Sequence, residues 1–204
     1  MSKYKNQPPD AYRERILEAA QTLFAQQGLE AVSMYQIAKK AGIGQGSLYR
    51  RYADKGEICS DLLGSGSERF LTMLEQDLEH ADGRQQPWLE HLQTCIVQIV
   101  DFIDQHAELL YTIKTEFTGK RQLTQFEHPI FQRLNGIMAT LLLRALERGE
   151  IRSIDIPFTA TALISALSPD LFLYQQKLHQ AGKTQIADGI IKLFVDGIRA
   201  ERKS

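Results

Sequence analysis

Hydrophobic residues recur along most of this chain at spacings of three, four and seven positions. That spacing brings them to one side of an α-helix, whereas the strict alternation typical of a half-buried strand appears nowhere in the sequence. We therefore predict an all-α protein. Pro169 lies inside one helical pattern and is expected to kink or restart that helix, with Ser168 as the cap. The expected helices cover residues 10–27, 34–41, 45–52, 54–80, 88–105, 107–115, 130–148, 157–180 and 183–202.

The first three helices are short, and glycines separate them. Gly28 follows the first helix at the position of a C-terminal glycine stop. The turn Gly42-Ile43-Gly44 joins the second helix to the third, because glycine accepts the positive φ of a tight turn without strain. The third helix begins Gln45-Gly46-Ser47-Leu48-Tyr49-Arg50, whose exposed side chains can hydrogen-bond to base edges or phosphates. This arrangement predicts a helix-turn-helix that binds DNA.

One ungapped run within residues 13–62 reads RERILEAAQTLFAQQGLEAVSMYQIAKKAGIGQGSLYRRYADKGEI. It resembles the N-terminal domain of the tetracycline-repressor (TetR) family of transcription regulators. The rest of the chain is similar to that family only in length and in the layout of its helices. The positions in register with the family pattern are the alanine pair before Phe24, Gly28, Ile37-Ala38, Ala41-Gly42, Gly46, Leu48-Tyr49 and Lys55.

The resemblance implies DNA contacts at particular positions. Ser33 would meet a phosphate through its hydroxyl and the free N–H groups at the start of the second helix. Gln45, Ser47 and Arg50 would point into the major groove, where Gln suits adenine and Arg suits guanine. Tyr49 and Lys55 would contact the sugar-phosphate backbone. The full implied set is Ser33, Tyr35, Gln45, Gly46, Ser47, Tyr49, Arg50, Arg51 and Lys55.

Two glycines depart from the family pattern near this face. Gly44 stands where the family usually has Ser or Thr, so we expect the third helix to lack a side-chain cap, at a small cost in stability. Gly56 follows Lys55 where an acidic residue is common in the family. The start of the next helix is therefore expected to be less well supported.

Charge is unevenly distributed along the chain. Residues 1–55 carry nine Lys and Arg against five Asp and Glu, and residues 56–204 carry fifteen against twenty. A basic head on an acidic body is expected of a nucleic-acid-binding segment joined to a domain with another role. We place a DNA-binding domain at residues 10–55 and a helical ligand-sensing and dimerisation domain at residues 56–204.

One helix-turn-helix reads too few base pairs to select a single genomic site. We therefore expect a homodimer on a palindromic, double-stranded DNA operator. The last two helices are the expected interface, as the resemblance also implies, because both carry apolar stripes and two glycines would allow a partner helix to approach closely. The predicted interface residues are Leu163, Leu167, Leu171, Gly189, Ile190, Leu193, Phe194 and Gly197.

Aromatic and soft side chains gather in the middle helices and predict a pocket that is mostly apolar with a few polar groups. An amphipathic or aromatic organic effector would suit such a pocket, although most of these residues are expected to serve as core. The candidate polar contacts are His91, Asp101, His106 and Glu116. The candidate lining residues are Phe70, Met73, Trp88, His91, Cys95, Phe102, Tyr111, Phe117, Phe131 and Met138.

Several other classes of function find no support in the sequence. Cys59 and Cys95 lie far apart, and no histidines show metal-ligand spacing, so we expect reduced thiols and no metal. The chain has no nucleophile motif, phosphate loop or dinucleotide fingerprint, which predicts a protein that is not an enzyme and has no cofactor. The longest apolar stretch is broken at Pro169 and is shorter than the roughly 20 residues of a membrane helix. A soluble, cytoplasmic protein without a membrane partner is expected.

These features predict a transcription regulator, in the simplest case a repressor that a small ligand releases from its operator by population shift. Two alternatives stay open. An architectural or activating DNA-binding protein of the same fold would have no inducer and a filled core. A ligand-binding or enzymatic helical protein with a degenerate head would show no salt-dependent, specific DNA binding.

Overall fold

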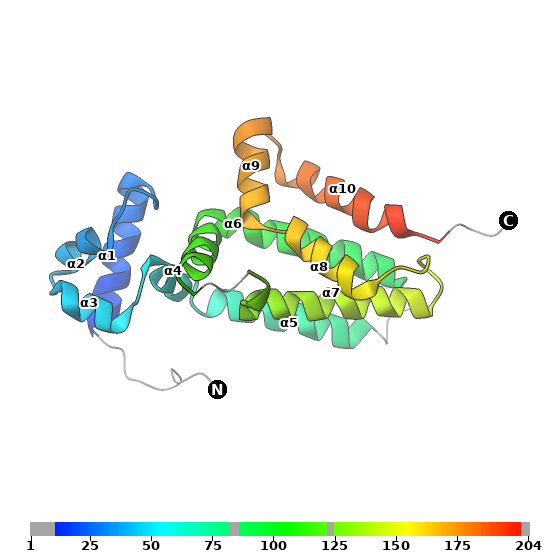
Figure 1. Ribbon diagram of the computed structural model, residues 1–204, viewed down its shortest axis with the longest axis horizontal. Helices are drawn as coiled ribbons and strands as arrows, with labels where there is room; N and C mark the ends of the chain where they lie inside the picture. Colours follow the sequence, from blue (N-terminus) through cyan, green and yellow to red (C-terminus); the bar gives the residue numbers. More distant parts are fainter. Residues whose placement is uncertain (1–10, 82–85, 122–124, 201–204) are drawn as a thin grey trace. The chain divides into compact units, whose positions relative to one another are not determined.

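The computed structural model describes residues 11–81, 86–121 and 125–200, without the side chains of 117–121 and 125. Within these ranges the regular structure is helical apart from one isolated bridge between Ile151 and Arg199, which confirms the all-α class (Figure 1). The chain forms two compact units: Met1–Gly64 with Glu108–Lys120, and Ser65–Ala107 with Arg121–Ser204. The basic arm expected over residues 1–9 lies outside the described residues.

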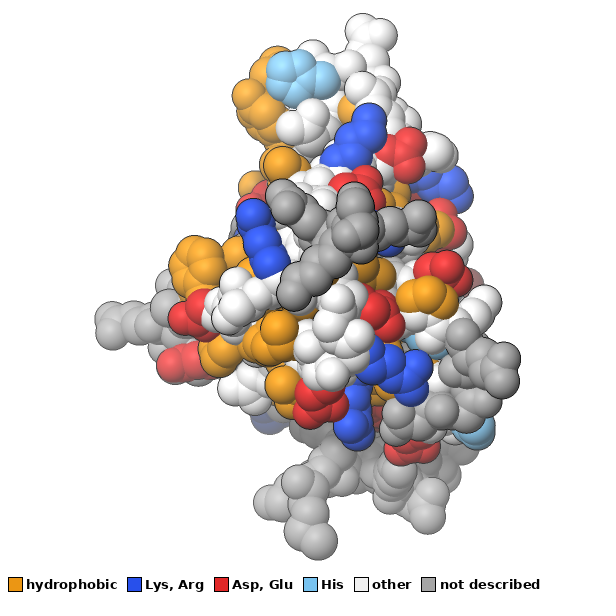
Figure 2. Space-filling view, turned by 90° about the vertical axis from the view of Figure 1, so that its right-hand side faces the viewer, with side chains coloured by type: hydrophobic (Ala, Val, Ile, Leu, Met, Phe, Trp, Pro, Cys, Tyr) orange, Lys and Arg blue, Asp and Glu red, His pale blue; other side chains and the backbone are white. Residues whose placement is uncertain are grey.

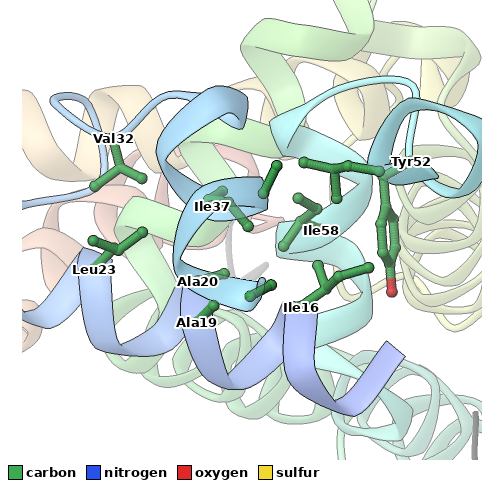
Figure 3. Close-up of a cluster of buried hydrophobic side chains, with 11 residues drawn as sticks. Ile16, Ala19, Ala20, Leu23, Val32, Ile37, Tyr52 and Ile58 are labelled. Atoms are coloured by element: carbon green, nitrogen blue, oxygen red, sulfur yellow. The ribbon is translucent and has the colours of Figure 1, made fainter. Parts of the chain in front are cut away.

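The first unit contains four short helices: α1 (Ala11–Gln27), α2 (Met34–Ala41), α3 (Gln45–Arg51) and α4 (Lys55–Leu63). The first three agree with the predicted ranges to within a residue at each end. Small alanines on α1 leave room for α2 to pack closely, and one buried side chain from α3 and one from α4 complete the core. The buried cluster consists of Ile16, Ala19, Ala20, Leu23, Val32, Ile37, Ala38, Ala41, Leu48, Tyr52 and Ile58 (Figure 3).

The helix predicted over residues 54–80 is in fact two helices, α4 and α5 (Ser65–Ala81), so that prediction was wrong. Gly64 separates them with φ 53° and ψ −136°, a conformation that no helical residue adopts and that favours glycine. The apolar spacing continues across the break, which is why the pattern did not reveal it. Gly64 and Ser65 are also the residues at which the chain passes from the first unit to the second.

Helix α6 (Trp88–Arg121) covers the two ranges predicted as 88–105 and 107–115. His106 has non-helical backbone angles (φ −133°, ψ 16°), so the helix is kinked at the predicted break although it continues beyond it. The His106 ring lies 4.8 Å from the ring of Phe102, and partial burial lowers the pKa of His106. The part of α6 before the kink belongs to the second unit and the part from Glu108 to the first.

The second unit continues with α7 (Pro129–Glu147), α8 (Ile156–Ala166), α9 (Pro169–His179) and α10 (Lys183–Phe194). Helix α7 packs against α5 and α8, and α10 packs against α8 and α9. The predicted interruption at Pro169 is confirmed, since α9 starts there and the Ser168 hydroxyl accepts a hydrogen bond from the Leu171 N–H (3.4 Å). Two 3₁₀ turns, Gln125–Glu127 and Asp196–Ile198, complete the helical elements of the described ranges.

The final helix ends at Phe194, earlier than the predicted residue 202. The backbone after Asp196 pairs instead with the segment before α8: the Arg152 N–H donates to the Ile198 carbonyl (3.0 Å) and the Ala200 N–H to the Glu150 carbonyl (2.9 Å). These long-range bonds satisfy backbone groups that a longer helix would otherwise pair. The local pattern could not predict partners so far away in the chain.

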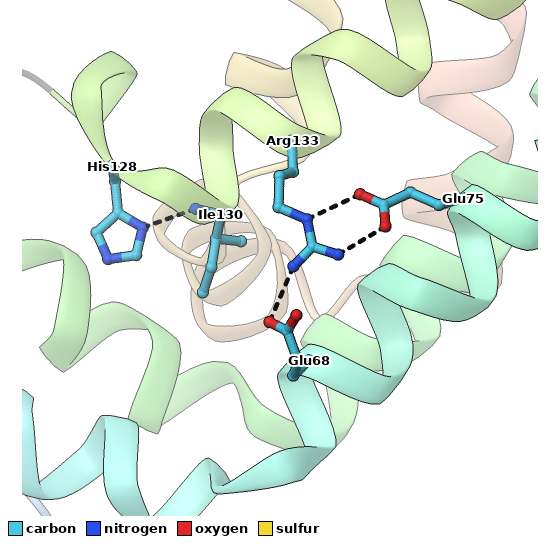
Figure 4. A network of polar contacts seen from close by, with 5 residues as sticks. All are labelled: Glu68, Glu75, His128, Ile130 and Arg133. Carbon is cyan, nitrogen blue, oxygen red and sulfur yellow. Dashed lines mark hydrogen bonds and ion pairs between the residues drawn. The ribbon is translucent and has the colours of Figure 1, made fainter. Parts of the chain in front are cut away.

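A polar bridge joins α7 to α5 in the second unit (Figure 4). The Arg133 guanidinium donates to Glu75 through Nε and Nη2 (2.8 and 2.7 Å) and to Glu68 through Nη1 (2.9 Å). The two glutamates are seven residues apart and therefore lie on the same side of α5. Beside this bridge, the His128 Nδ1 accepts from the Ile130 N–H (3.2 Å) at the start of α7.

Large apolar side chains remain exposed on the outer helices of the second unit. Phe158 of α8 is 72% exposed, and Tyr174 and Leu178 of α9 are also exposed. Hydrophobic side chains appear between charged ones on the face shown in Figure 2. Among the described helices none alone is long and apolar enough to cross a membrane; α8 and α9 reach that length and composition only as a pair bent by 47°.

Candidate nucleic-acid interface

Helix α2 begins at a complete capping box. The Ser33 Oγ accepts from the Gln36 N–H (3.3 Å), and the Gln36 carboxamide oxygen accepts from the Ser33 N–H and hydroxyl (2.8 Å each). Tyr35, in the first turn of this helix, is exposed. Such a box fixes the helix start, where the positive end of the helix dipole favours an anion. Ser33 lies where the resemblance predicts a phosphate contact, and a phosphate there would compete with Gln36 for the Ser33 hydroxyl.

A left-handed glycine makes the turn between α2 and α3. Gly42 has φ 64° and ψ 38°, and the N–H groups of Gly42 and Ile43 bond back to the last carbonyls of α2. From α1, the Arg15 Nη2 donates to the carbonyls of Ala41 (2.5 Å) and Gly42 (3.1 Å). A Cβ at position 42 would lie 2.8 Å from that nitrogen. Sequence reasoning missed Arg15, because its partners lie far away in the chain.

Helix α3 buries one residue and presents the others. Leu48 is fully buried in the core of the first unit. The Arg50 Nη2 donates to the Ser47 Oγ (2.9 Å), so the guanidinium is held beside the middle of the exposed face. No side chain caps the start of α3, as predicted from Gly44. The exposed residues of this helix are Gln45, Gly46, Tyr49, Arg50 and Arg51.

Lys55 is tied to the loop that precedes α2. Its Nζ donates to the carbonyls of Leu29 (2.8 Å) and Val32 (3.2 Å), so the side chain connects the start of α4 to the segment that carries Ser33. These bonds hold the ammonium group beside the start of α2. The phosphate contact of Lys55 stays a prediction, while its role in joining α4 to the α1–α2 loop follows from the geometry.

The start of α4 is well capped, which corrects the weaker support expected from Gly56. The Asp54 Oδ1 accepts from the Glu57 N–H (2.9 Å), and the Glu57 Oε2 accepts from the Ala53 N–H (2.7 Å). A Cβ at Gly56 would lie only 2.9 Å from the Glu116 Cβ. The glycine therefore permits close packing of α4 against the 108–120 part of α6, within the first unit.

A network of three side chains joins α1, the end of α3 and α4. The Arg13 guanidinium forms two bonds to the Asp61 carboxylate (Nε–Oδ2 2.9 Å, Nη2–Oδ1 2.6 Å), and the Tyr52 hydroxyl also donates to Asp61. Partial burial alone would raise the pKa of Asp61, but the hydrogen bonds from Arg13 and Tyr52 lower it overall. Burial and the bond to Asp61 raise the pKa of Tyr52. The network fixes the C-terminal end of α3, and sequence reasoning placed only Tyr52 in it, as partly core.

Comparison with known proteins decides the family. A model of the family described as "Bacterial regulatory proteins, tetR family" matches residues 16–62. An HTH-type transcriptional regulator of Staphylococcus aureus (strain MRSA252) is 32% identical over 188 residues, covering 91% of this chain and 94% of the relative. This chain belongs to the TetR family. It is therefore a transcriptional regulator, and the family is one of DNA-binding proteins rather than enzymes.

Solved structures of TetR-family and other regulators share the fold. The Thermus thermophilus FadR repressor, in complex with lauroyl-CoA, has a TM-score of 0.63 at 18% identity, over 94% of this chain and 97% of that chain. SmeT, the repressor of the Stenotrophomonas maltophilia multidrug efflux pump SmeDEF, has a TM-score of 0.60 at 18% identity, over 95% and 94%. At these identities the likeness describes the fold of this TetR-family chain.

The structure does not bring all the residues predicted to line a ligand pocket into one place. Phe70 and Phe102 stack with ring centroids 4.3 Å apart, and His91 and Cys95 share one small cavity. Trp88 and Met138 are buried in the core of the second unit, Phe131 packs edge-on against Phe126, and Met73 is 39% exposed. Tyr111 and Glu116 belong to the first unit, and the Phe117 side chain lies outside the described residues.

Two candidate polar contacts remain. The Asp101 Oδ1 forms an ion pair with the Nζ of Lys183 in α10 (2.8 Å), and His106 lies at the kink of α6. Trp88 is anchored through its backbone, since the Trp88 and Leu89 N–H groups donate to the Glu150 carboxylate (3.0 and 2.9 Å). In the described ranges no three His, Cys, Asp or Glu side chains are arranged to hold a metal ion.

The residues predicted for a dimer interface fall into two groups. Leu163, Leu167 and Ile190 are buried within the protomer, and Leu171 and Phe194 are half-buried. Leu193 is 72% exposed, and Gly189 and Gly197 are exposed as well. The exposed members all come from α10 and the turn that follows it, so the outward face of α10 is the part available to a partner.

Proposed function

We propose that this TetR-family regulator is a cytoplasmic, homodimeric repressor that occludes a palindromic operator and releases it when a small organic ligand binds the second unit. The observation that carries the proposal is the face of α3. Gln45, Tyr49 and Arg50 are exposed there around a buried Leu48, on a helix held by the Gly42 turn. Such a face suits the major groove, where Gln and Arg can read base edges.

We assign the DNA-binding function to residues 10–55. The first compact unit extends beyond this range and includes α4, which supports the DNA-binding helices. Ser33 caps α2, and the Lys55 ammonium group bonds to carbonyls of the loop before α2; contact of both residues with the DNA backbone is part of the proposal. A protein that neutralises phosphates releases counterions, so its affinity falls as salt rises. We therefore expect operator binding to weaken steeply with salt.

Dimerisation is assigned to α8 and α10. Phe158 and Leu193 are each 72% exposed, and a Cβ at Gly189 would meet nothing within 4 Å. Large exposed apolar side chains on adjacent helices are typical of surfaces that a partner covers. In a two-fold dimer the same patch is used on both copies, and two DNA-binding units reach two half-sites about 34–36 Å, or a multiple of this distance, apart.

Release by a ligand is supported by what is named for the structural neighbours. The Thermus thermophilus and Bacillus subtilis FadR structures contain lauroyl-CoA and stearoyl-CoA, respectively. SmeT is named as a repressor of an efflux pump. For this chain we propose an amphipathic or aromatic effector that binds one conformer of the second unit better and thereby shifts the population away from the DNA-binding state.

The test is selection of tight-binding duplexes from a random pool by the purified full-length protein, followed by titration with salt. A palindromic consensus is expected. Arg50→Ala should weaken binding to it by about tenfold to a hundredfold, because one bidentate base contact accounts for about 1–3 kcal/mol. Arg152→Ala is the matched control, since Arg152 is an exposed arginine of the second unit.

Other outcomes would change the proposal. Tight binding without sequence preference would indicate an architectural protein of the same fold. A half-site without symmetry would argue against the homodimer, which Leu193→Asp tests directly by sedimentation. The variant is expected to shift the protein to monomers and to lose operator binding while α3 is unchanged.

A further inference from the structure

The carbonyls at the end of α2 are bonded in two ways. The last carbonyls of an α-helix have no partner inside the helix and need donors from elsewhere. The N–H groups of Gly42 and Ile43 supply two of these donors, to carbonyls three and five residues earlier (3.2 and 3.0 Å). The carbonyls of Ala41 and Gly42 accept from the Arg15 Nη2 of α1 (2.5 and 3.1 Å). The turn that leads into α3 is therefore held by a side chain of another helix as well as by its own backbone.

The Arg15 guanidinium has a defined place beside this turn. Its central carbon lies 5.8 Å from the centroid of the Tyr12 ring, one turn earlier on α1, which is within the range of a cation–π contact. On the side of the turn, a Cβ at Gly42 would lie 2.8 Å from the Nη2 atom, so the guanidinium occupies space that only glycine leaves. The position of Arg15 and that of the turn therefore depend on each other.

The other end of α3 is also connected to α1. Tyr52 is the C-cap residue of α3, and its hydroxyl donates to the Asp61 carboxylate. The same carboxylate accepts two bonds from Arg13 (2.6 and 2.9 Å). Arg15 at the preceding turn and Arg13 at the C-cap therefore connect one helix, α1, to both ends of α3.

The direction of α3 matters more for reading bases than for binding phosphates. The helix has seven residues. It is therefore about 10 Å long, and a change of about 10° in its direction moves its far end by about 2 Å. Groups that bind with specific geometry must be held to within about 0.5 Å and 10–20°. Attraction to phosphates is less directional and carries no sequence information. A loosened turn should therefore reduce base discrimination before it reduces affinity for DNA in general.

We propose that Arg15 is a positioning residue that determines specificity: its bonds to the Ala41 and Gly42 carbonyls fix the direction in which α3 enters the major groove, without contact between Arg15 and DNA. This role rests on the proposed reading of DNA by α3. It adds to that proposal a residue of α1, outside the helix-turn-helix itself, on which discrimination between bases depends.

The test compares two duplexes, the selected operator and a scrambled duplex of the same length and composition, in titrations at several salt concentrations. Arg15→Met keeps an unbranched apolar side chain and removes every donor. The ratio of the two dissociation constants is expected to fall about tenfold, chiefly through weaker operator binding, because a base contact is misaligned while phosphate contacts remain. The salt dependence on the scrambled duplex should not change. A slope lower by about 0.9 would show that Arg15 itself contacts a phosphate and would overturn the proposal.

Two further variants separate the hydrogen bonds from the charge. Lys40→Met removes an exposed cation that lines the same open cleft as Arg15, and it should leave the ratio unchanged. Arg15→Lys should restore the greater part of the ratio, because an ammonium group can donate to two carbonyls, as that of Lys55 does in this unit. Equal ratios in Arg15→Met and Lys40→Met, or in Arg15→Lys and Arg15→Met, would contradict the positioning role.

A measurement without DNA keeps this proposal distinct from the proposed function. Hydrogen exchange at the Gly42 and Ile43 amides, followed by NMR on the full-length protein, should be about tenfold faster in Arg15→Met than in Arg15→Lys. If Arg15→Met does not fold, Arg15→Gln, whose amide is too short to reach both carbonyls, replaces it. The same exchange difference in a protein that selects no operator would remove the DNA-reading role and keep the hold of Arg15 on the turn. A selected operator with an unchanged ratio would keep the regulator and remove the role of Arg15.

Discussion

The two compact units of this TetR-family chain hold their functional side chains in different ways. In the first unit, the two charged side chains nearest the ends of α2 bind backbone carbonyls: Arg15 holds the α2–α3 turn and Lys55 holds the loop before α2. The polar face of α3 is left pointing outward. In the second unit, Arg133 joins two helices through Glu68 and Glu75, and polar side chains, Asp77 and His91 among them, line a small cavity.

The comparison teaches why the DNA-binding face could be recognised from the chain, whereas the lining of the cavity could not. A DNA-reading face needs a fixed backbone shape, and that shape depends on caps and glycines a few residues apart. The cavity of the second unit is lined by side chains that meet from three helices. Its members therefore share no short motif, and the same residue types also build ordinary core.

The largest effect that would sharpen this contrast is expected from Leu48→Ala. The side chain is fully buried beneath the α3 face, so its loss should cost about 2–5 kcal/mol and unfold or loosen the first unit. The second unit has its own core and is expected to remain folded. Hydrogen exchange resolved by peptide measures this, and equal loss of protection in residues 130–194 would show that the two units do not unfold separately.

A smaller effect is expected from Asp61→Asn, which removes the carboxylate shared by Arg13 and Tyr52. The free energy of unfolding should fall by about 1–2 kcal/mol at pH 7, because the partial exposure of the pair limits its contribution. Because the pKa of Asp61 is lower in the folded chain than in the unfolded chain, its stabilisation is present above about pH 4 and is lost as pH falls further.

Urea unfolding at several pH values measures this effect. The advantage of the natural protein over Asp61→Asn should shrink as the pH falls below about 4. Glu18→Gln, on an exposed position of α1, is the control and should change the free energy of unfolding little. A constant difference between Asp61 and Asn at all pH values would contradict the role of the carboxylate charge.

Arg133→Gln tests the second unit in the same way. It should lower the free energy of unfolding by less, about 0.5–1 kcal/mol. The Arg133 guanidinium and its partners are partly exposed, so water and salt weaken the bridge. The difference should fall further in 1 M salt, where the screening length is about 3 Å. Arg199→Gln, which removes the short-range pair with Asp196 (3.5 Å), three residues away in the chain, is the control for a bridge between helices.

The smallest effect concerns the positioning of Arg50 by Ser47. Ser47→Ala removes the hydroxyl that accepts from the Arg50 guanidinium, so discrimination at the base pair that we propose Arg50 reads should fall about threefold, for a bond of about 0.5–1 kcal/mol. Total affinity for the selected operator should change less. Ser47→Thr keeps the acceptor and should retain the base preference; an identical base preference in the two variants would show that the Ser47 hydroxyl does not position Arg50.

Prediction from the sequence succeeded where local signals mark an element. The three helices of the DNA-reading region and the restart at Pro169 agree with the structure, because glycine stops, caps and proline act within a few residues. It failed at Gly64, where the apolar spacing runs through the break, and at the end of α10, where Glu150 and Arg152 pair with the backbone after Asp196. The functional boundary placed at residue 55 stays a prediction. The first compact unit runs on to Gly64 and therefore includes α4.

By itself, the sequence determined the helical class, the family and the residues exposed on α3, because each of these follows from spacing and from residue types close together in the chain. Only the tertiary structure decided that Lys55 and Arg15 bind carbonyls, that Gly56 is required by Glu116, and that Asp77 and His91 share a cavity. These contacts join residues that are distant along the chain. Their distances depend on how whole helices pack, which periodicity does not specify.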